Sequence, residues 1–142
     1  MTIRAAAIRL KIPDNEAYTA LAALRRLGVQ TGRIERSQIW VFDDDGDERD
    51  FAQRVMANES LFNPNKHELE LLAGDRPREG EAWIAELDAR EEPVRVRGVR
   101  GGRRYVAWRL FEHGHEPASP QTVRAAVERL LCNPAIERAM YS

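Results

Sequence analysis

The apolar and polar positions of the first 42 residues predict a strand, a helix and a second extended segment. An apolar run at residues 3–10 is typical of a strand. Apolar residues then recur at helical spacing over 15–27, after the favourable N-cap residue Asp14 and before Gly28, a common helix stop. Residues 29–42 combine β-forming side chains with a length unusual for one strand, so we expect a bent strand or a hairpin.

A second helix and another strand are expected next. The acidic sequence at 43–50 indicates a turn and a helix start, because carboxylates favour the positive end of the helix dipole. Apolar residues from Phe51 to Phe62 are expected on one helix. This helix should end at Asn63-Pro64, because the residue before a proline is disfavoured in the α region. The alternating segment 67–73 predicts a strand.

The second half of the chain, after a linker loop at 74–80, is expected to repeat this plan. Residues 80–89 align with 15–24 through matching acidic, alanine and aromatic positions, which predicts a helix, although their alternation also fits a strand. Residues 94–111 contain two strand-like arms around Gly101-Gly102. A Gly-Gly pair at such a position is typical of a two-residue hairpin.

The last helix and strand have the clearest signals. Ser119 is a good N-cap residue, and Pro120 suits the first helical position. Five apolar residues follow the spacing of one helix face: Val123, Ala126, Val127, Leu130 and Leu131. Asn133-Pro134 is expected to stop this helix, and the apolar residues of 135–141 predict a closing strand.

The two halves together predict an internal duplication of a strand–helix–strand–strand–helix–strand unit. The first unit covers residues 1–73 and the second 74–142, with the strand at 67–73 closing one unit or opening the other. Such units pack an antiparallel sheet against helices on one face. We therefore expect the α+β class, as two tandem ferredoxin-like units.

Composition narrows the classes of function. The 142 residues suffice for one domain or two very small ones, and the net charge of −1 makes a nucleic-acid partner unlikely as a general property. The single cysteine, Cys132, cannot form an internal disulfide, which favours a reducing compartment. No apolar run approaches the roughly 18 residues of a membrane helix. We expect a cytoplasmic protein without membrane contact.

No catalytic residue, cofactor or metal site is expected from the sequence. The acidic segment 43–50 does not place ligands at the positions of an EF-hand loop. His113 and His115 have no third ligand nearby in sequence, and Cys132 has no base positioned to activate it. We expect the three tryptophans in the core: Trp40, Trp83 and Trp108.

Arginines are concentrated in the strand expected at 103–111. Val106, Trp108 and Leu110 share the face that should meet the helices. Four residues are then left on an open face: Arg103, Tyr105, Ala107 and Arg109. A solvated face is the simplest interpretation of this pattern. A protein interface is the main alternative, because Arg and Tyr are favoured there, and a phosphate or RNA surface is the third.

Several segments match the pattern of one known family. The strongest match is the sequence ERLLCNPAIE at 128–137, and weaker matches are Asp14, Ala20, Leu24, Leu27, Gly28, Val96, Gly98, Val99 and Arg100. With the order of predicted elements, these residues resemble PurS, the small subunit of phosphoribosylformylglycinamidine synthase in purine biosynthesis. The equivalent sequence in the first half, LFNPNKHEL, lacks the Ile-Glu pair of the second.

The resemblance implies a tandem PurS-like chain that is not catalytic by itself. Members of the family form dimers and bridge a synthetase subunit and a glutaminase subunit, so that the ATP- and glutamine-dependent ligase reaction takes place in the partners. We therefore expect a homo-oligomer and a partner interface at six residues: Arg97, Arg103, Tyr105, Arg109, Asn133 and Pro134. Two other hypotheses stay open, a small-molecule-sensing ferredoxin-like module and an RNA-binding sheet.

Overall fold

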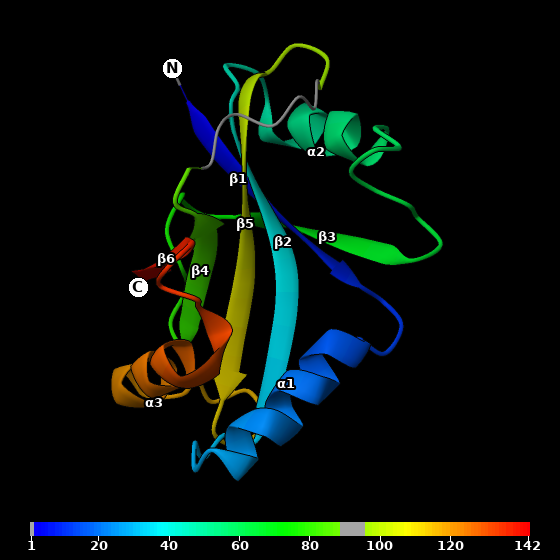
Figure 1. Ribbon diagram of the computed structural model, residues 1–142. Helices are drawn as coiled ribbons and strands as arrows, with labels where there is room; N and C mark the ends of the chain where they lie inside the picture. Colours follow the sequence, from blue (N-terminus) through cyan, green and yellow to red (C-terminus); the bar gives the residue numbers. More distant parts are fainter. Residues whose placement is uncertain (1, 89–95) are drawn as a thin grey trace. The chain divides into compact units, whose positions relative to one another are not determined.

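The chain forms an α+β fold with a six-stranded antiparallel sheet (Figure 1). The computed structural model describes residues 2–88 and 96–142, apart from the side chain of Arg100. In chain order the elements are β1 (Ile3–Leu10), α1 (Asn15–Arg26), β2 (Arg33–Asp43), α2 (Glu48–Met56), β3 (His67–Leu72), β4 (Glu81–Glu86), β5 (Arg100–Phe111), α3 (Pro120–Ala126), the π-helical turn η1 (Val127–Leu131) and β6 (Glu137–Tyr141).

The strand order in the sheet is β3-β1-β2-β5-β4-β6. From either edge inward, each half of the chain contributes its third, first and second strand in that order. β1 lies between β2 and β3, so that Ala6 is paired with both Trp40 and Leu71. β4 lies in the same way between β5 and β6, and Ala82 is paired with Trp108. The first strand of each half is therefore the central strand of its own three-stranded set.

Two compact units make up the fold, and each combines segments that are distant in sequence. The first unit consists of the described parts of three stretches: 1–13, 37–75 and 89–105. The second unit consists of three others: 14–36, 76–88 and 106–142. These units group residues by contact, whereas 1–73 and 74–142 are ranges of a sequence repeat. The boundary of the predicted repeat stays a prediction.

The first unit has an aromatic core that joins α2 to its strands. Trp40 and Phe42 of β2 stack with 6.1 Å between ring centroids, and Phe51 of α2 meets Phe42 edge-on at 6.0 Å. Val55 is buried one turn later on the same face of α2. Val96, from the second half of the chain, is also buried in this cluster.

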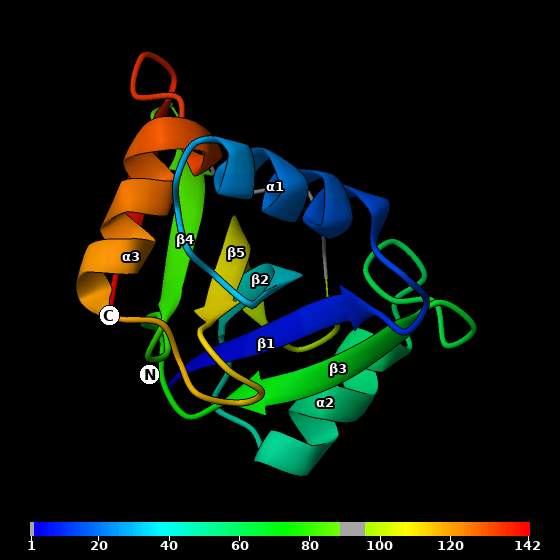
Figure 2. The same ribbon diagram turned by 90° about the horizontal axis from the view of Figure 1, so that it is seen from below.

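The second unit has a core of smaller residues, in which α1 and α3 lie side by side (Figure 2). Ala17, Ala20 and Leu24 form the buried face of α1. Val123 and Ala126 form that of α3. Both helices pack on β4 and β5 through one buried cluster. α1 belongs to the first half of the sequence but packs against strands of the second half.

The local signals at helix starts are confirmed. The Asp14 carboxylate accepts the backbone N–H groups of Glu16 at 3.0 Å and Ala17 at 3.2 Å, which caps α1. Ser119 caps α3 with Pro120 at the first helical position. Three predicted strands are present, at 3–10, 67–73 and 135–141. The segment 29–42 contributes a single strand, β2, and not a hairpin.

The expected end of the second helix is wrong. α2 ends at Met56, before the turn that contains Leu61 and Phe62. Asn58 explains the early end, because its side-chain oxygen accepts the N–H of Ser60 and its carbonyl accepts the N–H groups of Leu61 and Phe62. Asparagine competes with the helix by such local bonds. Leu61 and Phe62 are still buried in the core of the first unit.

Two predictions for the second half need correction. The described residues of 80–89 do not form a helix, and the alternative of a strand is confirmed, because β4 occupies 81–86. Residues 81–85 are all buried, and β4 is paired with a strand on each side. Gly101-Gly102 is not a hairpin turn, since both glycines lie within β5, with φ of 77° and 144°. The chain turns earlier, where Val99 donates to the carbonyl of Val96. Part of the first predicted arm, 94–95, lies outside the described residues.

Candidate functional site

The Asn133-Pro134 turn that follows η1 is built by the asparagine. Its side-chain oxygen accepts the N–H of Ala135 at 3.1 Å, and its carbonyl accepts the N–H groups of Ile136 at 3.0 Å and Glu137 at 2.7 Å. Its own N–H donates to Oε1 of Glu137 at 2.9 Å. The asparagine therefore folds the chain back so that β6 begins at Glu137.

The Asn63-Pro64 turn has the same bonds in the first unit. The Asn63 side chain accepts the N–H of Asn65 at 2.9 Å, and its carbonyl accepts those of Lys66 at 3.0 Å and His67 at 2.8 Å. Its N–H donates to Nδ1 of His67 at 2.9 Å. The imidazole nitrogen thus takes the place of the Glu137 carboxylate, and β3 begins at His67 as β6 begins at Glu137. The repeated Asn-Pro sequence corresponds to a repeated turn.

The face of β5 predicted to be open is largely buried. Tyr105 is 8% exposed and Ala107 1%, while Arg103 is exposed and Arg109 half-buried. The guanidinium of Arg109 lies 5.2 Å from the centre of the Phe111 ring. The prediction of an open face is therefore wrong at Tyr105 and Ala107, whereas Arg103 is exposed as expected. Consecutive residues are also buried in β1 and β4, at 5–8 and 81–85, so both faces of these strands are covered.

The six predicted interface residues are divided equally between the two units. Arg97, Arg103 and Tyr105 belong to the first unit, and the other three belong to the second: Arg109, Asn133 and Pro134. Four of the six are exposed, namely Arg97, Arg103, Asn133 and Pro134. Tyr105 cannot contact a partner in this structure because its side chain is buried.

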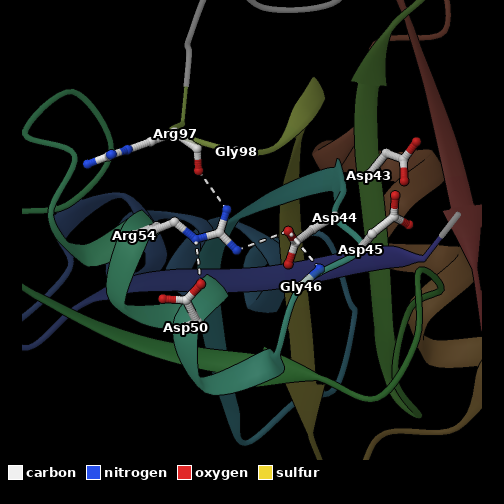
Figure 3. A pocket seen from close by; sticks show the side chains of 8 residues that line it. All are labelled: Asp43, Asp44, Asp45, Gly46, Asp50, Arg54, Arg97 and Gly98. Carbon is white, nitrogen blue, oxygen red and sulfur yellow. Dashed lines mark hydrogen bonds and ion pairs between the residues drawn. The ribbon is translucent and has the colours of Figure 1, made fainter.

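A polar cleft of about 510 Å³ lies in the first unit, between the end of β2, α2 and the loop after Val96 (Figure 3). Arg54 of α2 points into it and binds three neighbours. Nη1 donates to the carbonyl of Arg97 at 2.6 Å, Nη2 donates to Oδ1 of Asp44 at 2.9 Å, and Nε lies 3.3 Å from Oδ2 of Asp50. One guanidinium thus connects a loop, a helix and a strand end.

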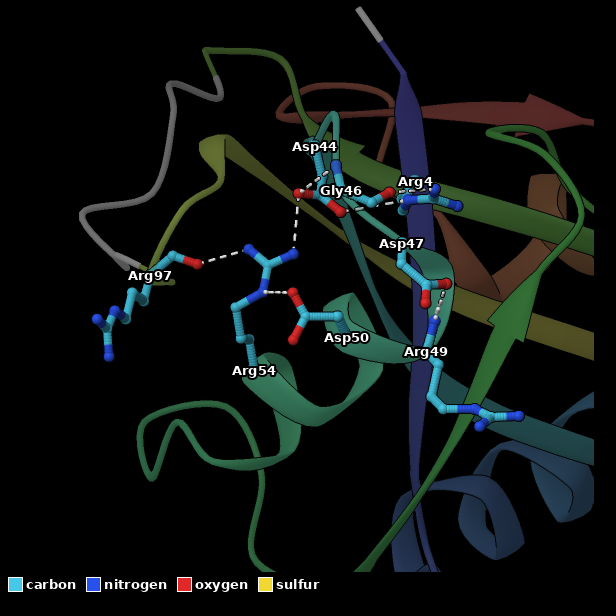
Figure 4. A network of polar contacts seen from close by, with 8 residues as sticks. All are labelled: Arg4, Asp44, Gly46, Asp47, Arg49, Asp50, Arg54 and Arg97. Atoms are coloured by element: carbon cyan, nitrogen blue, oxygen red, sulfur yellow. Dashed lines mark hydrogen bonds and ion pairs between the residues drawn. The ribbon is translucent and has the colours of Figure 1, made fainter.

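Asp44 is the buried member of this network, with a side chain that is 2% exposed (Figure 4). It accepts the N–H of Gly46 at 3.2 Å, and Nε of Arg4 lies 3.3 Å from Oδ2. Burial raises the pKa of Asp44, but the hydrogen bonds from Arg54 and Gly46 and the charges of Arg54 and Arg4 outweigh it, so the pKa lies below its ordinary value. The carboxylate is therefore held in its charged form.

The contacts that line the cleft fix the position of the turn between β2 and α2. Arg4 also donates to the Gly46 carbonyl at 2.6 Å, so the turn after β2 is fixed from both sides. Asp47 then caps α2 by accepting the N–H of Arg49, which confirms the predicted helix start (Figure 4). The Asp44–Arg54 pair was not foreseen from the sequence. Only the Asp50–Arg54 spacing of one helical turn gave a local signal.

The remaining candidate side chains belong to the second unit, and none of them lines the cleft. His113 and His115 are exposed in a loop, and in residues 2–88 and 96–142 no group of three or more His, Cys, Asp or Glu could hold a metal ion. Cys132 is half-buried against the core of the second unit. Burial, helped by the charge of Glu137, raises the pKa of its thiol, which disfavours the reactive thiolate.

Two further observations bear on the class of protein. None of the helices in the described part of the chain has the length and apolar character needed to cross a membrane. Comparison with known proteins finds neither a family model nor a curated protein that matches the sequence.

Proposed function

We propose that this protein is an adaptor that acts by binding other chains, a tandem form of the PurS-like small subunit. The observation that carries the proposal is the repeated turn. Asn63 and Asn133 make the same set of hydrogen bonds, and each turn leads into the edge strand of a three-stranded set. The second of these turns lies in the sequence ERLLCNPAIE, which has the strongest resemblance to the family.

The strand order supports the duplication on which this proposal depends. β3-β1-β2 and β6-β4-β5 are the same arrangement of third, first and second strands. A tandem chain of this kind would supply in one polypeptide the two copies that a PurS-like dimer supplies in two. Each half therefore places its first strand in the middle of its set.

The proposed partners are a synthetase subunit and a glutaminase subunit of purine biosynthesis, in the cytoplasm. In that assembly the amidine-forming chemistry, driven by ATP and glutamine-derived ammonia, belongs to the partners. The exposed arginines Arg97 and Arg103 are the contact residues proposed for them, because guanidinium groups are favoured in protein interfaces. The exposed Asn133-Pro134 turn is a second contact region.

Binding of the purified subunits tests the proposal directly. The full chain should retain the synthetase and glutaminase subunits of its own organism on an affinity column, and loss of the gene should slow growth without purines. The double variant Arg97→Ser/Arg103→Ser should weaken retention about tenfold or more, as expected for loss of interface residues. A matched control removes two other exposed arginines, Arg26→Ser/Arg76→Ser, and should bind normally. Failure of both subunits to bind the unaltered chain would disprove the adaptor role.

The cleft favours a second candidate function, a small-molecule-sensing module. Its volume of about 510 Å³ is within the range of ligand pockets, and the side chain of Arg97 is exposed beside it. A thermal-shift screen with amino acids and nucleotides separates the two functions. A ligand-dependent rise in the melting temperature that Arg54→Met removes would support sensing.

A further inference from the structure

Each Asn-Pro turn is joined to the end of a neighbouring strand, and the two junctions occupy equivalent positions. In the first unit, the N–H of Lys11 donates to the carbonyl of Lys66 at 2.8 Å, just beyond β1. In the second unit, the N–H of Leu87 donates to the carbonyl of Ile136 at 2.9 Å, just beyond β4. We call Lys11, Ile12 and Lys66 the N-terminal tip. The C-terminal tip has four residues: Glu86, Leu87, Asp88 and Ile136.

The N-terminal tip is cationic. Lys11 and Lys66 are the only lysines in the sequence, and both are exposed. They continue the β1–β3 pairing by one position beyond Leu10 and His67, so their backbones lie opposite each other, and the Lys11 ammonium donates to the carbonyl of Pro64 at 2.8 Å. Like charges directly opposite each other on paired strands are unfavourable. Ile12, which is 54% exposed, adds an apolar side chain to this tip.

The C-terminal tip has apolar residues at the positions equivalent to the two lysines, and acidic residues beside them. Leu87 and Ile136 replace the two lysines and are 56% and 59% exposed. They face each other one position beyond the pair Glu86 and Glu137. Glu86 and Asp88 flank the apolar pair and are both exposed. Arg138 is the cation nearest to Ile136 in sequence, two residues along β6.

We propose that the C-terminal tip of one molecule binds the N-terminal tip of another. The two lysines of one tip match the two carboxylates of the other, and Ile12 would cover part of the exposed Leu87–Ile136 pair. This contact relieves the repulsion between the facing lysines and removes apolar surface from water. Charge complementarity between two surfaces of the same chain is the reason for choosing a second copy as the occupant.

The contact has a consequence for assembly. It joins two different surfaces, so it is heterologous and leaves one free tip on each molecule of a pair. If the free tips bind further molecules, association continues to rings or open chains, and if they bind each other it ends at a two-fold pair. The inference does not depend on the proposed adaptor function, because it uses only the tips and a second copy of the chain.

Sedimentation velocity of the unaltered protein provides the first test. The average mass should rise as the concentration approaches the millimolar range. Association should weaken when salt is raised from about 0.1 M to about 1 M, which shortens the Debye length from about 10 Å to about 3 Å. A protein that stays monomeric throughout, or an association that salt leaves unchanged, would overturn the proposal.

Charge reversal gives the sharper test. Lys11→Glu/Lys66→Glu and Glu86→Lys/Asp88→Lys should each lose self-association by about tenfold or more, because both tips then carry the same charge. An equal mixture of the two variants should associate again, since opposite charges meet at both kinds of contact. The changed residues are exposed, and circular dichroism checks that each variant is folded.

A control variant and a neutral variant complete the design. Glu59→Lys/Asp75→Lys changes the net charge by the same amount at exposed positions outside the tips and should associate like the unaltered chain. Leu87→Ser/Ile136→Ser should weaken association with no change of charge. If association survives in the reversed variants, or if mixing them restores nothing, another surface such as the edge strands is responsible and the proposal is wrong.

Discussion

The buried carboxylate of Glu81 at the start of β4 allows a quantitative test of how the second unit is stabilised. Its side chain is fully buried, and Arg78, 20% exposed, binds it through Nη2 at 2.7 Å and Nε at 3.2 Å. Oε1 also accepts the backbone N–H of Arg78 at 2.8 Å and the indole N–H of Trp83 at 3.0 Å. One carboxylate thus organises the loop before β4 and the largest buried side chain of that strand.

Glu81→Ala should lower the free energy of unfolding substantially. Removing one partner of a buried ion pair costs about 3–5 kcal/mol, and the lower end applies here because the Arg78 guanidinium can still reach water. Arg78→Ala should cost about 4–5 kcal/mol, since it leaves a fully buried charge with only uncharged donors. The double variant Arg78→Met/Glu81→Leu should cost about 2–3 kcal/mol, no more than either single change, because it leaves no unpaired buried charge and loses only the acceptor of the Trp83 indole N–H and the Arg78 backbone N–H.

Urea unfolding followed by far-UV circular dichroism, with tryptophan fluorescence as a second probe, measures these differences. The exposed pair Arg9–Glu68 is the control: its atoms are as close, at 2.6 Å, but its side chains are 35% and 48% exposed. Arg9→Ala/Glu68→Ala should cost less than about 1 kcal/mol. The reasoning is refuted if Glu81→Ala costs no more than this control. It is also refuted if the double variant at 78 and 81 costs as much as Arg78→Ala and Glu81→Ala together.

The other predictions concern the cleft and the turns. Because the folded pKa of Asp44 is depressed, its contribution to stability is present above the unfolded value, near pH 4, and is lost as the pH falls through the lower folded value. Asp44→Asn should therefore flatten the acid limb of the unfolding free energy, measured by urea titration between about pH 3 and 7; an unchanged limb would contradict the assignment. Asn63→Ala and Asn133→Ala should each lower the melting temperature through the loss of about 1 kcal/mol from the side-chain bond. His67→Glu should preserve the first turn, since the second turn uses a glutamate at that position, whereas His67→Ala should destabilise it.

The sequence was informative where structure is decided by neighbouring residues. The caps at Asp14 and Ser119 and the return at Asn133-Pro134 each depend on bonds within four residues, and all three were predicted correctly. The segment 80–89 is different. Its apolar positions fit a helix and a strand equally, and the choice is made by β5 and β6, which pair with it from distant parts of the chain.

The candidate contacts were harder to predict for the same reason. Arg103 and Tyr105 alternate with Val106 and Trp108 as one-sided strand residues would, yet Tyr105 is buried because the second face of the sheet is covered too. Arg54 is similar: its partners Asp44 and Arg97 are brought to it by the fold, and only Asp50 is near in sequence.

An exchange of packing partners between the halves makes the predicted repeat hard to recognise in the sequence. Residues 11–32, which connect β1 to β2, contain α1, and α1 packs in the second unit. The shorter 87–99 connects β4 to β5, and its described residue Val96 packs in the first unit, against the core of α2. Aligning α1 with the residues that follow the linker therefore pairs a helix with a strand.

This exchange also bears on why the two tips differ. The strands and Asn-Pro turns are equivalent in the two halves, while the connections after β1 and β4 differ in length. Lys11 and Leu87 are the first residues of these unequal connections, and each lies opposite the residue just before the last strand of its set. Side chains there face solvent and constrain no core packing. If the chain arose by duplication, substitutions gave the two tips different charges while the backbone pairing beneath them was kept. The charge-reversal experiment measures whether this difference in charge drives association.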